Sequence, residues 1–296
     1  MRVTQGMLNT QMMRNLNNNL SRLKKIQDQL STGRNINQPS DDPVGISFAL
    51  RYRNALAANE QYIRNVDSAR SWVDYTESII SETNDVLQRA RELAVQGANG
   101  TNSDQSRDSI AAEIEQLYDH LVSLGNSQFN GKYIFNGQMT DIKPYDSANA
   151  KDATPHKGNI EFEVGVGITI PVNVSGADLF GEASDSTNVF RVMENLKNAL
   201  YSNDQDGINQ ALSDIDTRLD LIQTRFAEIG ARSNRIELIS KRLESESINL
   251  TQLLSKTEDA DMAELMINIK TEENIYQASL STGARIIQPS LIDFLR

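Results

Sequence analysis

The stretch Met13-Arg-Asn-Leu-Asn-Asn-Asn-Leu-Ser-Arg-Leu-Lys-Lys-Ile-Gln-Asp-Gln-Leu30 decides the class of fold. Its apolar residues recur at alternating intervals of three and four, with Gln27 at the one polar position. A narrow heptad stripe of this kind is typical of a helix that pairs with another helix rather than one that is buried on all sides. Gly33 predicts the end of the helix, and residues 35–43 read as an irregular connector. The stripe consists of Met13, Leu16, Leu20, Leu23 and Leu30.

Similar spacing predicts further helices along the chain. A long helix over residues 44–96 follows the start signal Asp41-Asp42-Pro43, and a shorter one covers residues 110–124. Within the long helix the stripe repeats every seven residues, at Val66, Val73, Ile80, Leu87 and Ala94. Another long helix begins near Asp206.

The last helix carries a second terminal stripe. We assign this stripe, together with apolar residues of the segment that closes the chain, to the C-terminal assembly seam. Its positions are Met262, Met266, Ile269, Tyr276, Leu280, Ile287, Leu291, Phe294 and Leu295. Residues 1–40 are net positive and residues 257–296 are net negative, which favours pairing of the two terminal helices or pairing with neighbouring subunits.

A different pattern lies between the helices. Asn130-Gly131 and Asn136-Gly137 favour tight turns with positive φ. Apolar residues then alternate with polar ones or glycine from Phe162 to Val174, which predicts strand with a turn near Gly165 or Gly167 and a sheet edge at Pro171.

The predicted fold is therefore mainly α: a long antiparallel coiled-coil helical bundle formed by the N- and C-terminal parts, with a small inserted β-rich domain. We assign residues 1–40 and 260–296 to terminal coiled-coil assembly helices. Residues 41–137 and 186–259 form the bundle core, and residues 138–185 form the β-rich outer insertion. Each terminal helix has too few apolar residues to be stable in isolation, so we expect residues 1–40 and 260–296 to be largely disordered in the monomer and to fold when they meet neighbouring subunits.

Composition excludes several classes of function. The formal charge of −11 argues against a nucleic-acid partner, which needs clustered Lys and Arg. The absence of cysteine excludes disulfides and thiolate metal sites, and no apolar run is long enough to span a membrane. The N-terminus also lacks the apolar core of a cleaved secretory signal.

No catalytic, cofactor or metal site is expected. His120 and His156 lack partners at metal-ligand spacing, and Gly165-x-Gly167 lacks the third glycine of a dinucleotide site. Acidic groups such as Asp41-Asp42 are better explained as helix starts than as calcium ligands. We therefore expect a protein that is not an enzyme.

Both ends carry recognisable motifs. Gln29-Leu-Ser-Thr-Gly-Arg-Asn-Ile-Asn-Gln-Pro-Ser-Asp-Asp-Pro-Val-Gly45 resembles the N-terminal signature of the flagellin family. Ala278-Ser-Leu-Ser-Thr-Gly-Ala-Arg-Ile-Ile287 and Ser290-Leu-Ile-Asp-Phe-Leu-Arg296 resemble its C-terminal signature. Within that family, Phe129-Asn-Gly-Lys-Tyr-Ile-Phe-Asn-Gly137 followed by Pro144-Tyr145 is similar to hook-associated junction proteins rather than to filament flagellins.

The resemblance implies a structural protein of the extracellular bacterial flagellum at the hook–filament junction. Such a protein is exported by the flagellar type III apparatus without a cleaved signal peptide. It would form a ring layer with copies of itself, between hook-associated protein FlgK and the flagellin filament, and would bind an export chaperone of the FlgN type through its C-terminal helix. No nucleic acid or membrane is implied.

Two alternatives remain at this point. The nearer one is a filament flagellin. The other is a coiled-coil sensor or signalling module, which would normally carry a membrane span or a partner domain. The segments Leu30–Ser40 and Leu280–Ser290 also resemble each other, either as a duplicated contact element or by coincidence.

Overall fold

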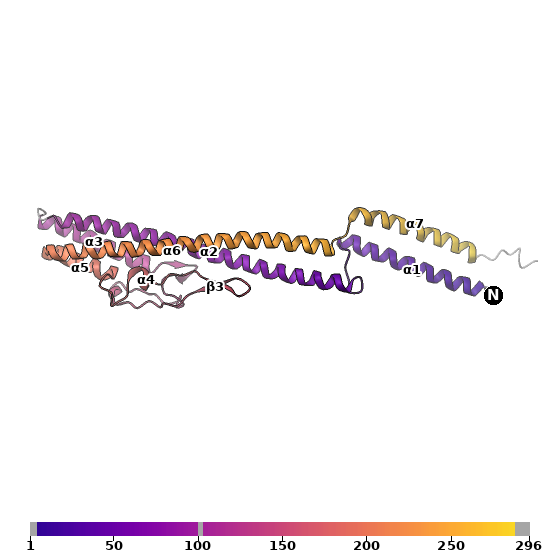
Figure 1. Cartoon of the computed structure of the whole chain (residues 1–296), viewed down its shortest axis with the longest axis horizontal. Coiled ribbons are helices and arrows are strands. Elements are labelled where there is room, and N and C mark those ends of the chain that lie inside the picture. Colours follow the sequence, from indigo (N-terminus) through magenta and orange to yellow (C-terminus); the bar gives the residue numbers. More distant parts are fainter. Residues whose placement is uncertain (1–4, 100–102, 288–296) are drawn as a thin grey trace, which may run out of the picture. The chain divides into compact units, whose positions relative to one another are not determined.

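The computed structural model describes residues 5–99 and 103–287, which fall into two compact units (Figure 1). Of the described residues, the first unit comprises 5–58 and 246–287, and the second comprises 59–99 and 103–245. Two long helices, α2 (Pro43–Gly97) and α6 (Gln205–Glu258), contribute to both units. The predicted mainly helical fold is confirmed.

The first unit contains α1 (Gln5–Thr32) and α7 (Met262–Ile287), which lie side by side. They run antiparallel, because Asn19 hydrogen-bonds Ser279 while Arg22, further along α1, pairs with Glu272, further back along α7. The helix end predicted at Gly33 is confirmed: α1 stops at Thr32, and Gly33 has a φ of +69°. Glycine is favoured there because it adopts this conformation without steric strain.

An irregular connector joins α1 to α2, as predicted. Asp41 organises it: one carboxylate oxygen accepts the backbone N–H groups of Asn37 (3.2 Å) and Gln38 (3.0 Å). The other lies 3.0 Å from Lys25 Nζ in α1. Asp42 then accepts the N–H of Val44 at 3.0 Å, which caps the start of α2.

The second unit is a helical bundle of α2, α3 (Asp104–Gly125), α5 (Val189–Ser202) and α6. The seven-residue repeat predicted in α2 forms its core, and each member is at most 1% exposed. Small buried residues at intervening positions, such as Ala69 and Ala90, let neighbouring helices approach closely. Helix α5, which packs on α3, was not singled out by the sequence, although Val189, Met193, Leu196 and Leu200 have helical spacing.

One short hairpin precedes the insertion, and a second lies within it. In the first, β1 (Gln128–Phe129) pairs with β2 (Lys132–Tyr133) through a turn in which Asn130 and Gly131 have φ values of +51° and +76°. In the second, β3 (Glu161–Gly165) pairs antiparallel with β4 (Ile168–Pro171), and Gly167 at the turn has a φ of +68°. Both predicted turns at these places are confirmed.

The insertion contains less strand than the alternating pattern suggested. Besides the second hairpin it has a short 3-10 helix, η1 (Ala150–Asp152), a short α4 (Gly176–Phe180) and loops. In these loops, side-chain amides make hydrogen bonds to backbone groups that the ladder of a β-sheet would otherwise supply. Asn173 accepts the N–H of Ile160 at 2.8 Å, and its amide donates to the carbonyl of Gly158 at 2.9 Å.

The two similar segments near the chain ends have different conformations. In the first copy, Gly33 is left-handed and terminates α1. In the second, Gly283 is helical inside α7, and a Cβ there would collide with the Met12 side chain of α1. The difference favours coincidence over a duplicated contact element.

Candidate assembly surface

The α1–α7 pair is a heptad seam. Along each helix, most of the buried or half-buried residues recur at alternating intervals of four and three, as in an antiparallel coiled coil; Gln29 and Glu273 are the additional ones. In α1 they are Met12, Leu16, Asn19, Leu23, Ile26 and Leu30. In α7 they are Leu265, Ile269, Glu272, Tyr276, Ser279 and Gly283.

This seam is rotated relative to the two stripes expected from the sequence. Leu16, Leu23, Leu30, Ile269 and Tyr276 belong to both the expected and the observed sets. At the intervening positions the structure uses the preceding residue instead, so Asn19 replaces Leu20 and Ser279 replaces Leu280. The sequence did not reveal this, since polar residues in a heptad normally indicate the solvent face.

The displaced apolar residues form an open flank, which we call the methionine–leucine stripe. It comprises Met13, Leu20, Met266 and Leu280, which are 51%, 48%, 50% and 43% exposed. In an antiparallel pair, positions that directly follow corresponding seam positions of the two helices share one side. At these positions the pair places Asn19 and Ser279 in the seam and leaves Leu20 and Leu280 exposed, the reverse of what apolar burial alone would favour.

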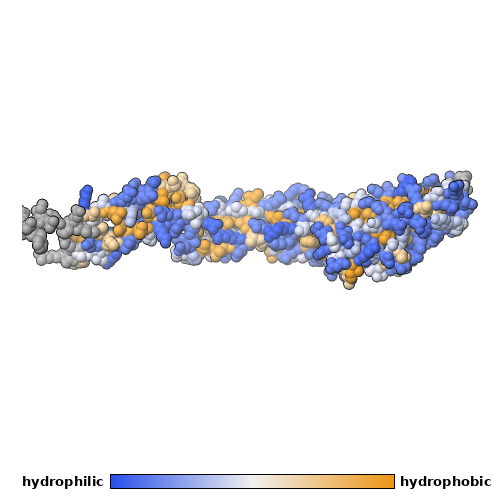
Figure 2. All heavy atoms as spheres, turned by 180° about the vertical axis from the view of Figure 1, so that it is seen from behind, coloured by the Kyte–Doolittle hydropathy of each residue, from blue (hydrophilic) through white to orange (hydrophobic). Residues whose placement is uncertain are grey.

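The opposite flank is hollowed. A groove of about 440 Å³ is lined by both helices, with Leu8, Met12 and Leu16 on α1 and Ile275 and Gly283 on α7. Apolar side chains are visible at the surface of the α1–α7 pair in Figure 2. Met262, also expected in the stripe, is 48% exposed.

Part of the expected C-terminal set cannot be placed. Ile287 is the last residue of α7, and nothing is described of its side chain. Leu291, Phe294 and Leu295 lie outside the described residues.

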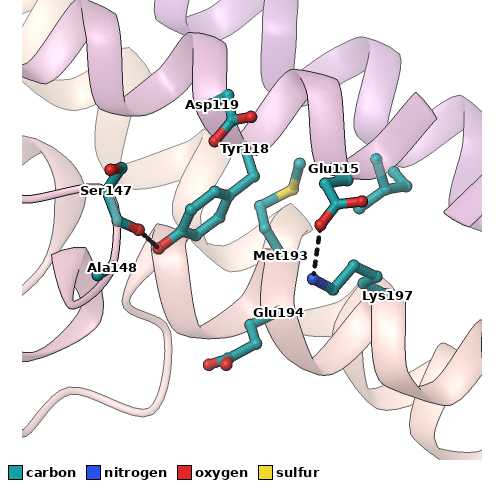
Figure 3. A pocket seen from close by; sticks show the side chains of 9 residues that line it. Glu115, Tyr118, Asp119, Ser147, Ala148, Met193, Glu194 and Lys197 are labelled. Carbon is teal, nitrogen blue, oxygen red and sulfur yellow. Dashed lines mark hydrogen bonds and ion pairs between the residues drawn. The ribbon is translucent and has the colours of Figure 1, made fainter. Parts of the chain in front are cut away.

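A separate pocket of about 230 Å³ lies between α3 and α5 (Figure 3). Several of its polar groups are engaged: the Tyr118 hydroxyl donates to the carbonyl of Ser147 at 3.3 Å, and Lys197 pairs with Glu115 at 3.2 Å. Burial raises the pKa of the Tyr118 hydroxyl above its ordinary value. The pocket is smaller than typical ligand sites and presents no reactive arrangement.

Within residues 5–99 and 103–287, no group of three or more His, Asp or Glu side chains is arranged to hold a metal ion. In the same part of the chain, none of the helices has both the length and the apolar character needed to cross a membrane.

The structure defines a mainly helical protein whose N- and C-terminal helices pair. Residues 3–140 match the family model of the bacterial flagellin N-terminal helical region. Residues 207–295 match the family model of the bacterial flagellin C-terminal helical region. The chain therefore belongs to the flagellin family and is a structural protein of the bacterial flagellum rather than an enzyme.

Relatives share nearly the whole length. Flagellar hook-associated protein 3 of Escherichia coli is 28% identical over 94% of this chain and 95% of its own. Flagellin of Bacillus subtilis is 30% identical over 97% of both chains. The crystal structure of Bacillus cereus FlgL, at 23% identity, has the same fold, with a TM-score of 0.60 over 69% of this chain and 99% of that one.

Proposed function

We propose that this protein forms the hook–filament junction, polymerising as a short layer between hook-associated protein FlgK and the flagellin filament. The carrying observation is its similarity to flagellar hook-associated protein 3 over nearly the full length of both chains. The motif Phe129–Gly137 followed by Pro144-Tyr145, which resembles the junction proteins, points the same way.

Assembly would use residues 1–40 and 260–296, with residues 41–137 and 186–259 as the bundle core and residues 138–185 as the outer insertion. Inward residues such as Leu16, Leu23 and Ile269 join α1 to α7. The methionine–leucine stripe then packs on neighbouring copies. Covering a half-exposed Met or Leu contributes about 1 kcal/mol, so several such contacts per subunit stabilise a closed layer.

Export would proceed through the flagellar type III apparatus, without a cleaved signal peptide and before the layer forms. Exposed apolar residues on α7, among them Met266 and Ile267 (67% exposed), would then need protection from non-specific association. An amphipathic helix that is recognised in an apolar groove is a common mode of binding. We therefore assign α7 as the segment bound by an export chaperone of the FlgN type.

A second candidate is filament flagellin. The 30% identity to Bacillus subtilis flagellin over nearly the whole of both chains favours it. Both candidates use the same helical packing, so they differ in whether growth stops after one layer.

Seeding distinguishes them. Purified protein is added to isolated hooks that end in FlgK, with flagellin from the same organism as a matched control, and products are measured by electron microscopy. We expect a short layer of fixed length, from which the flagellin filament then elongates. Continued elongation by this protein alone would instead identify filament flagellin. A layer that flagellin fails to extend would contradict the junction role.

A further inference from the structure

We propose that Leu238 on α6 of one copy packs into a groove between α2 and α6 of a neighbouring copy. The contact belongs to the second unit rather than to the terminal helices. It rests on the proposed function only in that copies of the chain must meet in an assembly.

The groove has an apolar floor and an unused polar group. Its volume is about 370 Å³, and Phe226, which is 39% exposed, forms part of its wall. Asn84 Oδ1 is shielded from solvent and accepts no hydrogen bond within the described part of the chain. The groove therefore suits an apolar side chain that arrives together with a hydrogen-bond donor. The lining residues are Ser81, Asn84, Ile222, Gln223, Phe226 and Ala227.

The rim of the groove is acidic. Glu77 lies one helical turn before the α2 residues that line the groove, and Asp220 lies at the corresponding place before those of α6. Neither carboxylate is ion-paired within the described residues. The one base among residues 220–231, Arg225, is held by Asp178 and Glu228 of the same chain. The rim therefore presents negative charge that a basic partner can neutralise.

Leu238 is an apolar side chain with basic surroundings. It is 68% exposed. Residues three and four positions away are neighbours on the same face of a helix, and three of those four positions hold Arg235, Lys241 and Arg242. Lys241 pairs with Glu237, whereas Arg235 and Arg242 form no ion pair within the described part of the chain. Leu238 and its surroundings are thus complementary in charge to the acidic groove.

The occupant of the groove is a second copy of this chain. Leu238 lies twelve residues beyond Phe226, which is about 18 Å along α6, so the leucine is out of reach of its own groove. A contact between two different surfaces of identical subunits is heterologous, and such contacts close into rings or continue as helices. Complementary charge selects the partner and fixes its register.

The contact is too small to form dimers by itself. One leucine with two or three charges covers far less than the roughly 1,200–2,000 Å² that stable interfaces bury. In an assembly, other contacts hold the copies at a high effective concentration. We therefore expect the groove to be filled in the layer and open in the dilute monomer.

The absence of cysteine from the sequence allows a direct test by cross-linking. Full-length Leu238→Cys is mixed with full-length Ala227→Cys, and the mixture is seeded onto isolated hooks that end in FlgK under mild oxidation. A disulfide requires Cβ atoms about 3.5–4.5 Å apart. Mass spectrometry of non-reduced peptides should show a link between positions 238 and 227 in the layer and none in dilute solution. Asn209→Cys, also exposed on α6, replaces Ala227→Cys in the matched control and should give no link.

Charge reversal tests how the groove recognises its partner. Arg235→Glu/Arg242→Glu places like charges opposite the rim, and Glu77→Arg/Asp220→Arg does the same from the other side. Each pair of substitutions should lower the amount of layer at least about tenfold, because like charges across a contact repel. The chain that carries all four substitutions should assemble again. Thermal unfolding of each monomer checks that the bundle is intact.

Arg64→Glu/Arg70→Glu reverses two exposed bases on α2 and is the control for net charge; it should assemble normally. An equal loss in this control would overturn the inference, as would normal assembly of either reversed pair or failure of the fourfold variant to recover. The link is scored in whichever assembly the natural protein forms. A short layer without the link contradicts only this contact, whereas a continuous filament that carries the link contradicts only the junction role.

Discussion

Arg53 and Glu258 form a two-point ion pair that ties α2 to the last residue of α6. Arg53 Nε donates to one carboxylate oxygen at 3.1 Å, and Nη2 contacts the other. Glu258 is 2% exposed and also pairs with Arg34, just beyond α1. Its backbone carbonyl accepts the N–H of Asn35 at 2.7 Å. Glu258 therefore joins the segment that follows α1 to the C-terminal end of α6.

Glu258→Gln should loosen this junction. The amide keeps the shape but loses the charge shared by Arg34 and Arg53, and hydrogen bonds to charged groups contribute about 1.5–3 kcal/mol each. We expect a loss on the order of 2 kcal/mol in local stability, measured as faster amide hydrogen exchange at Asn35 and Ala260. Glu237→Gln, which breaks an exposed pair with Lys241, should have little effect on stability, because solvent screens that pair. Equal effects of the two substitutions would contradict the assigned role.

Acid should weaken the second unit partly through Asp185. Burial acts to raise its pKa, but hydrogen bonds from Thr187 and Arg218 outweigh burial and leave the pKa below its ordinary value. A carboxylate with a lowered folded pKa stabilises the fold above its unfolded pKa, near 3.8, and that stabilisation disappears as the pH falls through the folded value.

Asp185→Asn should therefore lower stability at pH 7 and flatten the decline below about pH 4.5, because the titrating group is gone. Thermal unfolding followed by circular dichroism at several pH values measures this. Asp67→Asn, at an exposed position of α2, is the control and should leave the slope intact. A parallel decline in Asp185→Asn and the natural protein would rule the residue out.

Gly283→Ala should stabilise α7 less than a glycine-to-alanine substitution usually stabilises a helix. Replacing a helical glycine by alanine stabilises by about 0.5–1 kcal/mol where space allows. Gly230 in α6 has open space around it, so Gly230→Ala should gain that amount. At Gly283 the new methyl would meet the flexible end of the Met12 side chain, which must shift, so Gly283→Ala should gain less than Gly230→Ala and should speed hydrogen exchange in α1.

Truncating the obstructing side chain tests the explanation directly. Gly283→Ala combined with Met12→Ala should exchange more slowly than Gly283→Ala alone, because the collision is removed. Additive effects of the two substitutions would show that they do not share a contact.

Charge on the methionine–leucine stripe should block assembly and leave the fold intact. Met13→Glu/Met266→Glu places carboxylates where we propose that neighbouring copies pack, and burying an unpaired charge costs several kcal/mol. Layer formation on hooks should fall at least about tenfold, while the melting of the bundle stays unchanged. Asn17→Glu, also exposed on α1, should assemble normally. Normal layer formation by the double variant would show that the methionine–leucine stripe does not contact neighbouring copies.

The helices could be predicted because their apolar spacing repeats over many turns, and the two glycine turns because Asn130-Gly131 and Gly167 demand positive φ. The choice between overlapping seams could not. Leu20 looks like the core residue and Asn19 like the surface residue until hydrogen bonds to a distant helix are known. The loops of the insertion escaped prediction for the same reason, since Asn173 and its like act through long-range amide contacts.

The contrast between Gly33 and Gly283 extends to how the sequence can change over time. At Gly33 the backbone itself requires glycine, whatever surrounds it. At Gly283 the constraint is weaker and comes from the flexible end of the Met12 side chain, so a smaller residue at position 12 relieves it. Among related chains, position 33 should therefore stay invariant on its own, whereas positions 12 and 283 should vary together.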